Sequence, residues 1–234
     1  MKVSFLSFGL GLLLLHVCLA SEILIGKHSH AYTHDSIRNN QENSLGIYNG
    51  KKTTIAKFPF MVPTRRSVVP GREYQHCVKG GQLFTADKVL VNVNYTGSWD
   101  YDIVVVKLNK PIKFGKYVKP IKLVTTSLKP KTKVAIAGWG PASQSEVVSL
   151  NLLTAKVTVY NRRKCAETYS DLTSRQLCTY DTKVGPCDSD CGDPLVYKNA
   201  VYGLYAGGYN CLSVPAVYVD VPSFVEWVKN TIKE

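Results

Sequence analysis

The chain has 234 residues, of which 45% are hydrophobic, and it carries a formal net charge of +12. This apolar share excludes a disordered protein, and the length allows one sizeable core or two small ones packed together. Lys and Arg outnumber Asp and Glu by 29 to 17, an excess that favours anionic partners or serves general solubility.

Residues 1–20 have the layout of a secretory signal peptide. Lys2 is the one charge, an apolar core runs from Leu10 to Leu15, and a small-residue exit ends at Ala20. No later apolar stretch approaches the ~20 residues that span a bilayer. We therefore expect a secreted, extracellular protein without membrane insertion, whose mature chain begins near Ser21.

Residues 21–46 are polar and are expected to form a flexible pro-segment. His28, His30 and His34 lie in this stretch, where a solvated tail is favoured over a metal site. We expect neither a metal nor another cofactor.

From residue 47 onward, short β-rich runs alternate with Gly and Pro turns. This pattern predicts an all-β barrel or sandwich rather than a parallel α/β sheet. The predicted strands are residues 88–93, 103–108, 134–139, 155–160, 200–205 and 216–221.

The last element is predicted to be an α-helix. Ser223 and Glu226 have the spacing of a capping box at its start. Its predicted apolar face consists of Phe224, Trp227, Val228 and Ile232.

The positive charge is concentrated locally, in the runs Lys129–Lys133 and Arg162–Lys164. No nucleic-acid-binding motif accompanies them. We expect a partner that is an extracellular protein or an anionic polymer, and no nucleic acid.

Six segments, taken in order, resemble the chymotrypsin-like serine protease family and cover nearly all of residues 47–234. The resemblance implies two six-stranded antiparallel β-barrels with an active site between them, followed by a C-terminal helix. The segments are Ile47–Gly50 (mature N-terminus), Phe58–Val62 (first strand), Asp102–Leu108 (strand of the triad aspartate), Gly138–Gly140, Cys187–Leu195 (nucleophile loop) and Pro215–Tyr218 with the helix after it.

The resemblance implies that the catalytic triad is degraded. Asp102 keeps the aspartate, whereas Asn94 stands in place of the histidine and Cys191 in place of the serine. An asparagine cannot accept a proton near neutral pH, and a thiol without a base stays mostly protonated. All three positions are therefore expected to be non-functional.

One alternative to this interpretation stays open. In a second alignment, His76 and Cys77 form the family's His-Cys pair, although the match at Gly80 and Gly81 is then lost. The chain is then an active endopeptidase with Cys191 as the nucleophile.

The substrate pocket and the activation site are also implied only as remnants. Gly185, Gly208 and Ala216 occupy pocket positions, and Ala216 replaces a glycine that keeps the family's pocket open. Ile47 and Asp190 match the pair that forms on activation. Ile47 does not follow the basic residue that a trypsin-like activator recognises.

Six cysteines remain once Cys18 leaves with the signal peptide, and the sequence alone allows fifteen complete pairings. The resemblance implies the disulfides Cys165–Cys178 and Cys187–Cys211. Cys77 and Cys191 are left over, and we expect either a bond between them or two buried thiols.

Asn94-Tyr95-Thr96 is the sole N-glycosylation sequon in the sequence. A glycan there would cover the former catalytic position. Because the aligned position lies on a partly buried strand, we expect the sequon to stay unused, with glycosylation of Asn94 as the alternative.

The resemblance therefore implies a secreted pseudoprotease that acts by binding a protein or a polyanion. The nucleophile-loop changes and the ending Tyr209-Asn210-Cys211 are similar to inactivated paralogues of the mite group 3 protease allergens. That similarity implies a role in immune or complement modulation. Residues 47–234 are expected to form the protease-homologue domain.

Overall fold

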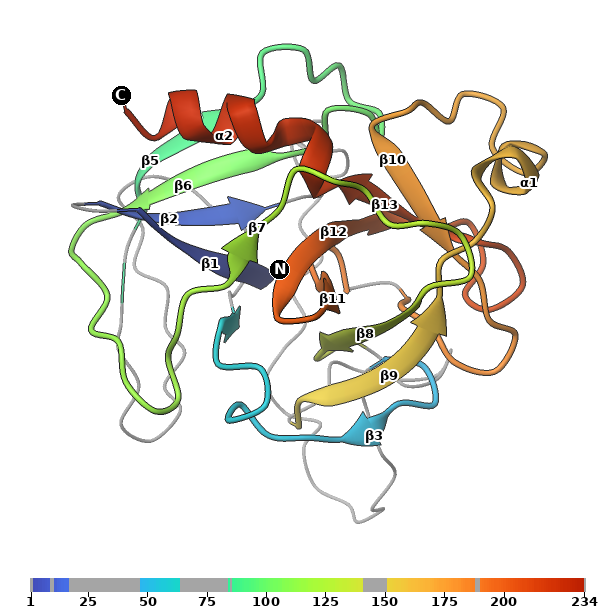
Figure 1. Ribbon diagram of the computed structural model, residues 1–234, viewed down its shortest axis with the longest axis horizontal. Helices are drawn as coiled ribbons and strands as arrows, with labels where there is room; N and C mark the ends of the chain where they lie inside the picture. Colours follow the sequence, from blue (N-terminus) through green and yellow to red (C-terminus); the bar gives the residue numbers. More distant parts are fainter. Residues whose placement is uncertain are drawn as a thin grey trace, which may run out of the picture.

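The computed structural model of the protein describes residues 2–8, 11–16, 47–63, 84, 86–140, 151–187 and 190–233. In this part of the chain, two β-sheets account for most of the regular structure, and a short helix ends the chain (Figure 1). The all-β prediction is confirmed.

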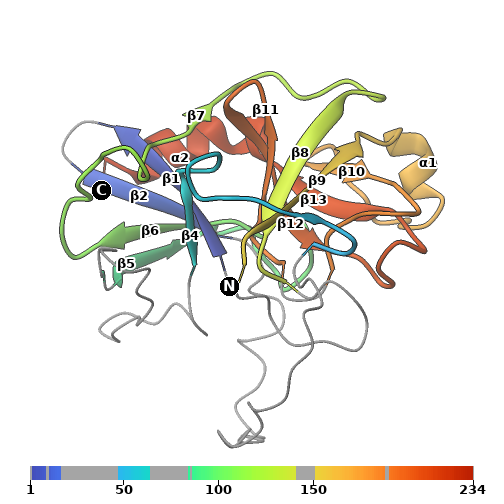
Figure 2. The ribbon, with the colours of Figure 1, turned by 90° about the horizontal axis from the view of Figure 1, so that it is seen from below.

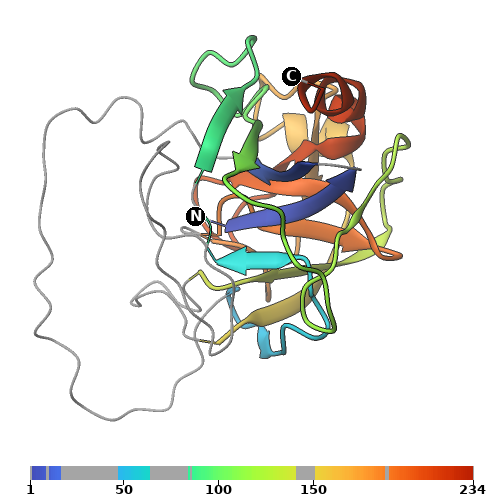
Figure 3. The ribbon, with the colours of Figure 1, turned by 90° about the vertical axis from the view of Figure 1, so that its left-hand side faces the viewer.

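The first sheet has five antiparallel strands in the order β4-β1-β2-β6-β5. Figure 3 shows the blue strands β1 and β2 between the cyan strand β4 and the green strands β5 and β6. Val104, Val105 and Val106 of β6 are buried in its core. The strands are β1 (Lys2–Phe8), β2 (Gly11–His16), β4 (Met61–Pro63), β5 (Ala86–Val91) and β6 (Val104–Leu108).

The second sheet has the order β10-β13-β12-β11-β8-β9-β3, with β7 paired in parallel to β12. It lies beside the first sheet, on the right in Figure 2. Its strands are β3 (Lys51–Lys52), β7 (Lys122–Leu123), β8 (Lys133–Gly138), β9 (Leu153–Thr158), β10 (Gln176–Thr179), β11 (Pro194–Tyr197), β12 (Ala200–Gly207) and β13 (Ala216–Asp220).

The six predicted strands correspond to β5, β6, β8, β9, β12 and β13, with ends displaced by up to two residues. The short strands β3, β7, β10 and β11 were not predicted, because two to four residues carry too little alternation to be recognised. The described residues form sheets of five and eight strands rather than two sets of six.

Strands β1 and β2 lie within residues 1–20, the predicted signal peptide. They pair with β4 and β6. Cleavage after residue 20 stays a prediction, and it would remove both strands from the first sheet. The predicted pro-segment, residues 21–46, lies outside the described residues.

The C-terminal helix is present, but its predicted capping box is wrong. A 3-10 turn (Val221–Phe224) leads into α2 (Val225–Thr231), so the first α-helical residue follows Phe224. The Ser223 hydroxyl donates to the buried carboxylate of Asp220 at 2.8 Å, and no described side chain accepts from the first backbone N–H groups of the helix, as a capping box requires. Glu226 pairs with Lys229 at the surface.

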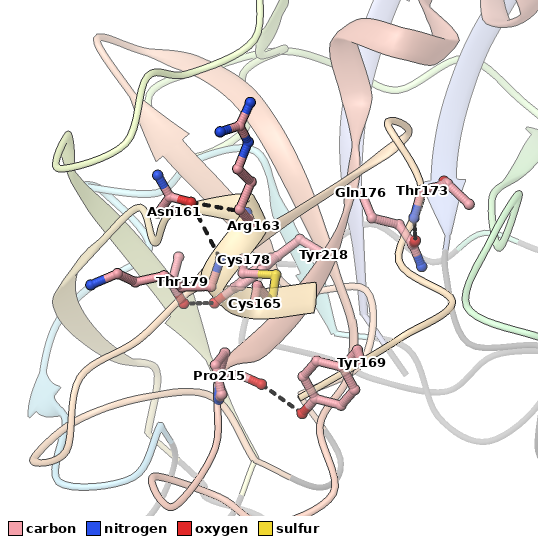
Figure 4. Close-up of a disulfide and its surroundings, with 11 residues drawn as sticks. Asn161, Arg163, Cys165, Tyr169, Thr173, Gln176, Cys178, Thr179, Pro215 and Tyr218 are labelled. Atoms are coloured by element: carbon pink, nitrogen blue, oxygen red, sulfur yellow. Dashed lines mark hydrogen bonds between the residues drawn. A yellow bond between two sulfur atoms is a disulfide. The ribbon is translucent and has the colours of Figure 1, made fainter. Parts of the chain in front are cut away.

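A second short helix, α1 (Arg162–Ala166), was not predicted. Asn161 caps it, because its Oδ1 accepts hydrogen bonds from the backbone of Arg163 and Lys164. The disulfide Cys165–Cys178 then ties α1 to β10 (Figure 4). The asparagine at the N-cap position was the signal that could have located it. No helix in the described ranges is long and apolar enough to cross a membrane.

Candidate functional site

Asp102 is fully buried just before strand β6, and Tyr95 is its neighbour. Desolvation, with a smaller contribution from the negative charge of Asp102, raises the pKa of Tyr95 to about 12. The Tyr95 hydroxyl is buried without a hydrogen-bond partner in the described part of the chain. Tyr95 therefore stays protonated near neutral pH and cannot serve as a base beside Asp102.

Asn94 lies in an exposed turn after β5, not on a partly buried strand as predicted. The strand ends at Val91, and the buried side chain of Asn92 closes the turn by accepting the Asn94 backbone N–H at 3.1 Å. This local hydrogen bond takes the place of strand pairing, so the chain turns after Val91 and the Asn94 side chain is exposed to solvent. The sequon is consequently at the surface.

Cys191 is disulfide-bonded. Its Sγ lies 3.8 Å from the carbonyl oxygen of Ala206. The other four cysteines of the described residues pair with one another, as Cys165–Cys178 and Cys187–Cys211. Cys77, the predicted partner, and His76, of the second alignment, lie outside the described residues.

The three predicted pocket residues, Gly185, Gly208 and Ala216, line one cavity in the second sheet. Its volume is about 10 Å³, room for roughly one water molecule. Leu212 is among its lining residues, and its Cδ2 lies 3.1 Å from where a Cβ on Gly185 would be.

Ile47 and Asp190 are both completely buried. The Asp190 carboxylate accepts the backbone N–H groups of Gly140 at 2.7 Å and Cys187 at 3.0 Å. Ile47 packs in the core of the second sheet, and the next residue, Tyr48, pairs with Gly185. Ile47 therefore lies in this core while its nitrogen is part of a peptide bond rather than a free ammonium group. Backbone N–H groups already stabilise the negative charge of Asp190.

An aromatic cluster lies at the edge of the second sheet, and the sequence did not predict it. Trp99 packs on Tyr169 and Tyr209 with ring centroids 5.5 and 5.2 Å apart. The Tyr169 hydroxyl donates to the Pro215 carbonyl at 2.7 Å (Figure 4). Gly207, which has no side chain, leaves the space that Trp99 fills. A glycine at the end of a β-rich run was the available signal.

The loop that carries Trp99 is anchored across the two sheets by an ion pair. Arg175 donates to both carboxylate oxygens of Asp100, at 2.9 and 2.5 Å. Its guanidinium also stacks 4.3 Å from the ring centre of Tyr101. This bidentate contact fixes the loop between Tyr95 and Asp102.

Several known proteins are similar to this chain in sequence. Chymotrypsin-2 of Vespa crabro is 31% identical over 152 residues, which are 63% of this chain and 69% of that protein. Trypsin of Sarcophaga bullata is 26% identical over 227 residues, which are 80% and 89%. Serine protease 1 of Rattus norvegicus is 31% identical over 159 residues, or 64% of each chain.

A solved structure has the same fold. Neuropsin, a serine protease expressed in the limbic system of mouse brain, matches with a TM-score of 0.62 and 26% identity. The match covers 64% of this chain and 72% of neuropsin. The family model described as Trypsin matches residues 63–228, so the chain belongs to the trypsin family and has the chymotrypsin-like fold.

Proposed function

We propose that this trypsin-family protein is a secreted pseudoprotease, which acts by binding rather than by cutting peptides. The disulfide at Cys191 carries the proposal. A sulfur committed to a disulfide has no thiolate with which to attack a peptide carbonyl. An active endopeptidase with Cys191 as its nucleophile requires a free thiol, which the disulfide removes.

Three further features support the proposal. Asn94, in the histidine position, is an amide and faces solvent. Tyr95, beside Asp102, has a pKa of about 12 and holds its proton. The remnant of the substrate pocket has space for about one water molecule. The positions proposed for the nucleophile, the base and the substrate pocket thus support the proposal separately.

The proposal assigns Cys77 as the partner of Cys191 in the mature protein, since Cys18 would leave with the signal peptide. It also takes the binding partner to be an extracellular protein or an anionic polymer.

Similarity to inactivated paralogues of the mite group 3 protease allergens makes immune or complement modulation part of the same proposal. A complement-lysis assay with added protein addresses that part.

The test uses the secreted protein under non-reducing conditions, with a broad peptide library and a thiol-directed probe. We expect no cleavage and no labelling of Cys191. Peptide mapping should then recover a Cys77–Cys191 crosslink. Reproducible cleavage that is lost in the Cys191→Ala variant would refute the proposal.

A further inference from the structure

A row of lysines lies on the outer side of strands β3, β9 and β8. Lys51 is opposite Thr154, Lys156 follows two residues along β9, and Lys133 is opposite Thr158. Residues opposite each other, and residues two apart on one strand, share a face of a sheet. All three lysines are exposed, whereas Val134, Leu153 and Val157, which belong to the opposite face, are buried. Lys52, on that opposite face at the edge of the sheet, is exposed as well.

The turn before β8 extends this row. The Lys131 backbone N–H donates to the Val159 carbonyl at 2.8 Å, and Val159 donates back to Thr132 at 2.9 Å. The turn therefore lies at the end of β9, and the exposed Lys129 and Lys131 continue the charge there. We call the set the basic strip: Lys51, Lys129, Lys131, Lys133 and Lys156.

The charge of the basic strip is not compensated within the described part of the chain. Strands β3, β8 and β9 and residues 129–132 contain no Asp or Glu. None of the five lysines forms an ion pair with a described residue. Diagonal neighbours in a sheet are ~7–8 Å apart, about one Debye length at physiological salt. The positive potentials of the lysines consequently add, and an extended anion lying across them would relieve their repulsion.

We propose that the basic strip binds a sulfated polysaccharide. The inference rests on the proposed function, because it names the partner and the surface of a protein that acts by binding. A linear chain with repeated sulfate groups complements lysines that recur along a rigid sheet face. The other residues of that face offer no aromatic ring on which nucleic-acid bases could stack: Thr154, Thr158 and Ala135 are partly exposed, and Ala137 is buried.

The test measures binding to immobilised heparin as a function of salt, for the secreted protein and two triple variants. The first replaces Lys131, Lys133 and Lys156 with Gln. The second, matched for charge, replaces Lys110, Lys116 and Lys119, which are exposed in the loop after β6. Counterion release predicts that the first variant lowers the slope of log affinity against log salt by about 2–3.

The wild type should bind at 0.15 M salt, and the loop variant should keep its slope. Thermal melting of both variants checks that they are folded. Equal weakening by both triple variants, or no binding by the wild type, would overturn the assignment to the basic strip. Competition by duplex DNA as effective as that by free heparin would overturn the choice of polymer. Peptide cleavage, measured on the same samples, tests the proposed function separately.

Discussion

Trp99 lies against Gly207 so closely that a Cβ atom at residue 207 would stand 2.8 Å from the indole carbons Cε2 and Cζ2. The indole cannot simply retreat, because Tyr169 and Tyr209 pack against it. A loop of the first sheet thus fills a space that the second sheet leaves empty.

Gly207→Ala should therefore destabilise the protein by about 1–3 kcal/mol through overpacking. Gly208→Ala is the matched control, since its Cβ would meet the nearest atom at 3.5 Å, an ordinary contact. Denaturant unfolding under non-reducing conditions gives both free energies, and near-UV circular dichroism reports the Trp99 environment. Similar free energies for the two variants would contradict the close contact.

The ion pair between Asp100 and Arg175 should make stability depend on acid. Burial alone would raise the pKa of Asp100, but the hydrogen bond and charge of Arg175 outweigh it and hold the pKa below its usual value of 3.8. The resulting stabilisation is present above pH 3.8 and disappears as the pH falls through the folded-state pKa.

We expect Asp100→Asn to cost about 1 kcal/mol at pH 7, the order of a well-formed but partly exposed ion pair. The difference from wild type should shrink as the pH is lowered below 3.8. Unfolding curves at several pH values measure it. A difference that stays constant down to the most acidic pH would show that the charge of Asp100 is not responsible.

Asp220 should have the opposite dependence. Burial raises the pKa of its carboxyl, against the lowering effect of hydrogen bonds from Ser127 and Ser223. Stability from this group is complete below pH 3.8 and is lost as the pH rises through the raised folded-state pKa. Asp220→Asn mimics the protonated form, so the variant should be at least as stable as the wild type at pH 7. Its free energy of unfolding relative to the wild type should fall as the pH is lowered, because the wild-type carboxyl is then protonated too. Strong destabilisation at pH 7 would contradict this prediction.

The sequence predicted the fold well, because six β-rich runs and their turns mark the longest strands. The family resemblance also implied the disulfides Cys165–Cys178 and Cys187–Cys211, which the structure contains. It failed where one local hydrogen bond decides the backbone, as at Asn92 and at Ser223. The contact of Trp99 with Gly207 joins residues more than a hundred positions apart, which no local pattern reveals.

The exposed turn makes Asn94 a usable glycosylation site. Protein secreted from eukaryotic cells should shift in mobility after glycosidase treatment. The shift should vanish in Asn94→Gln and in Thr96→Ala but persist in Thr96→Ser, because the sequon requires a hydroxyl at its third position. If the mobility of the wild type does not change after treatment, Asn94 carries no glycan, and the sequon is unused as the sequence analysis expected.

Cleavage of the predicted signal peptide would remove a strand that pairs with β6. Leu13 to His16 of β2 pair with Val104 to Lys107 of β6, so a mature chain that begins at Ser21 has one edge of β6 without that partner. An open strand edge pairs readily with other segments. N-terminal sequencing of secreted protein should give Ser21. If residues 1–20 persist instead, the cleavage prediction is wrong, and β1 and β2 are permanent strands of the sheet.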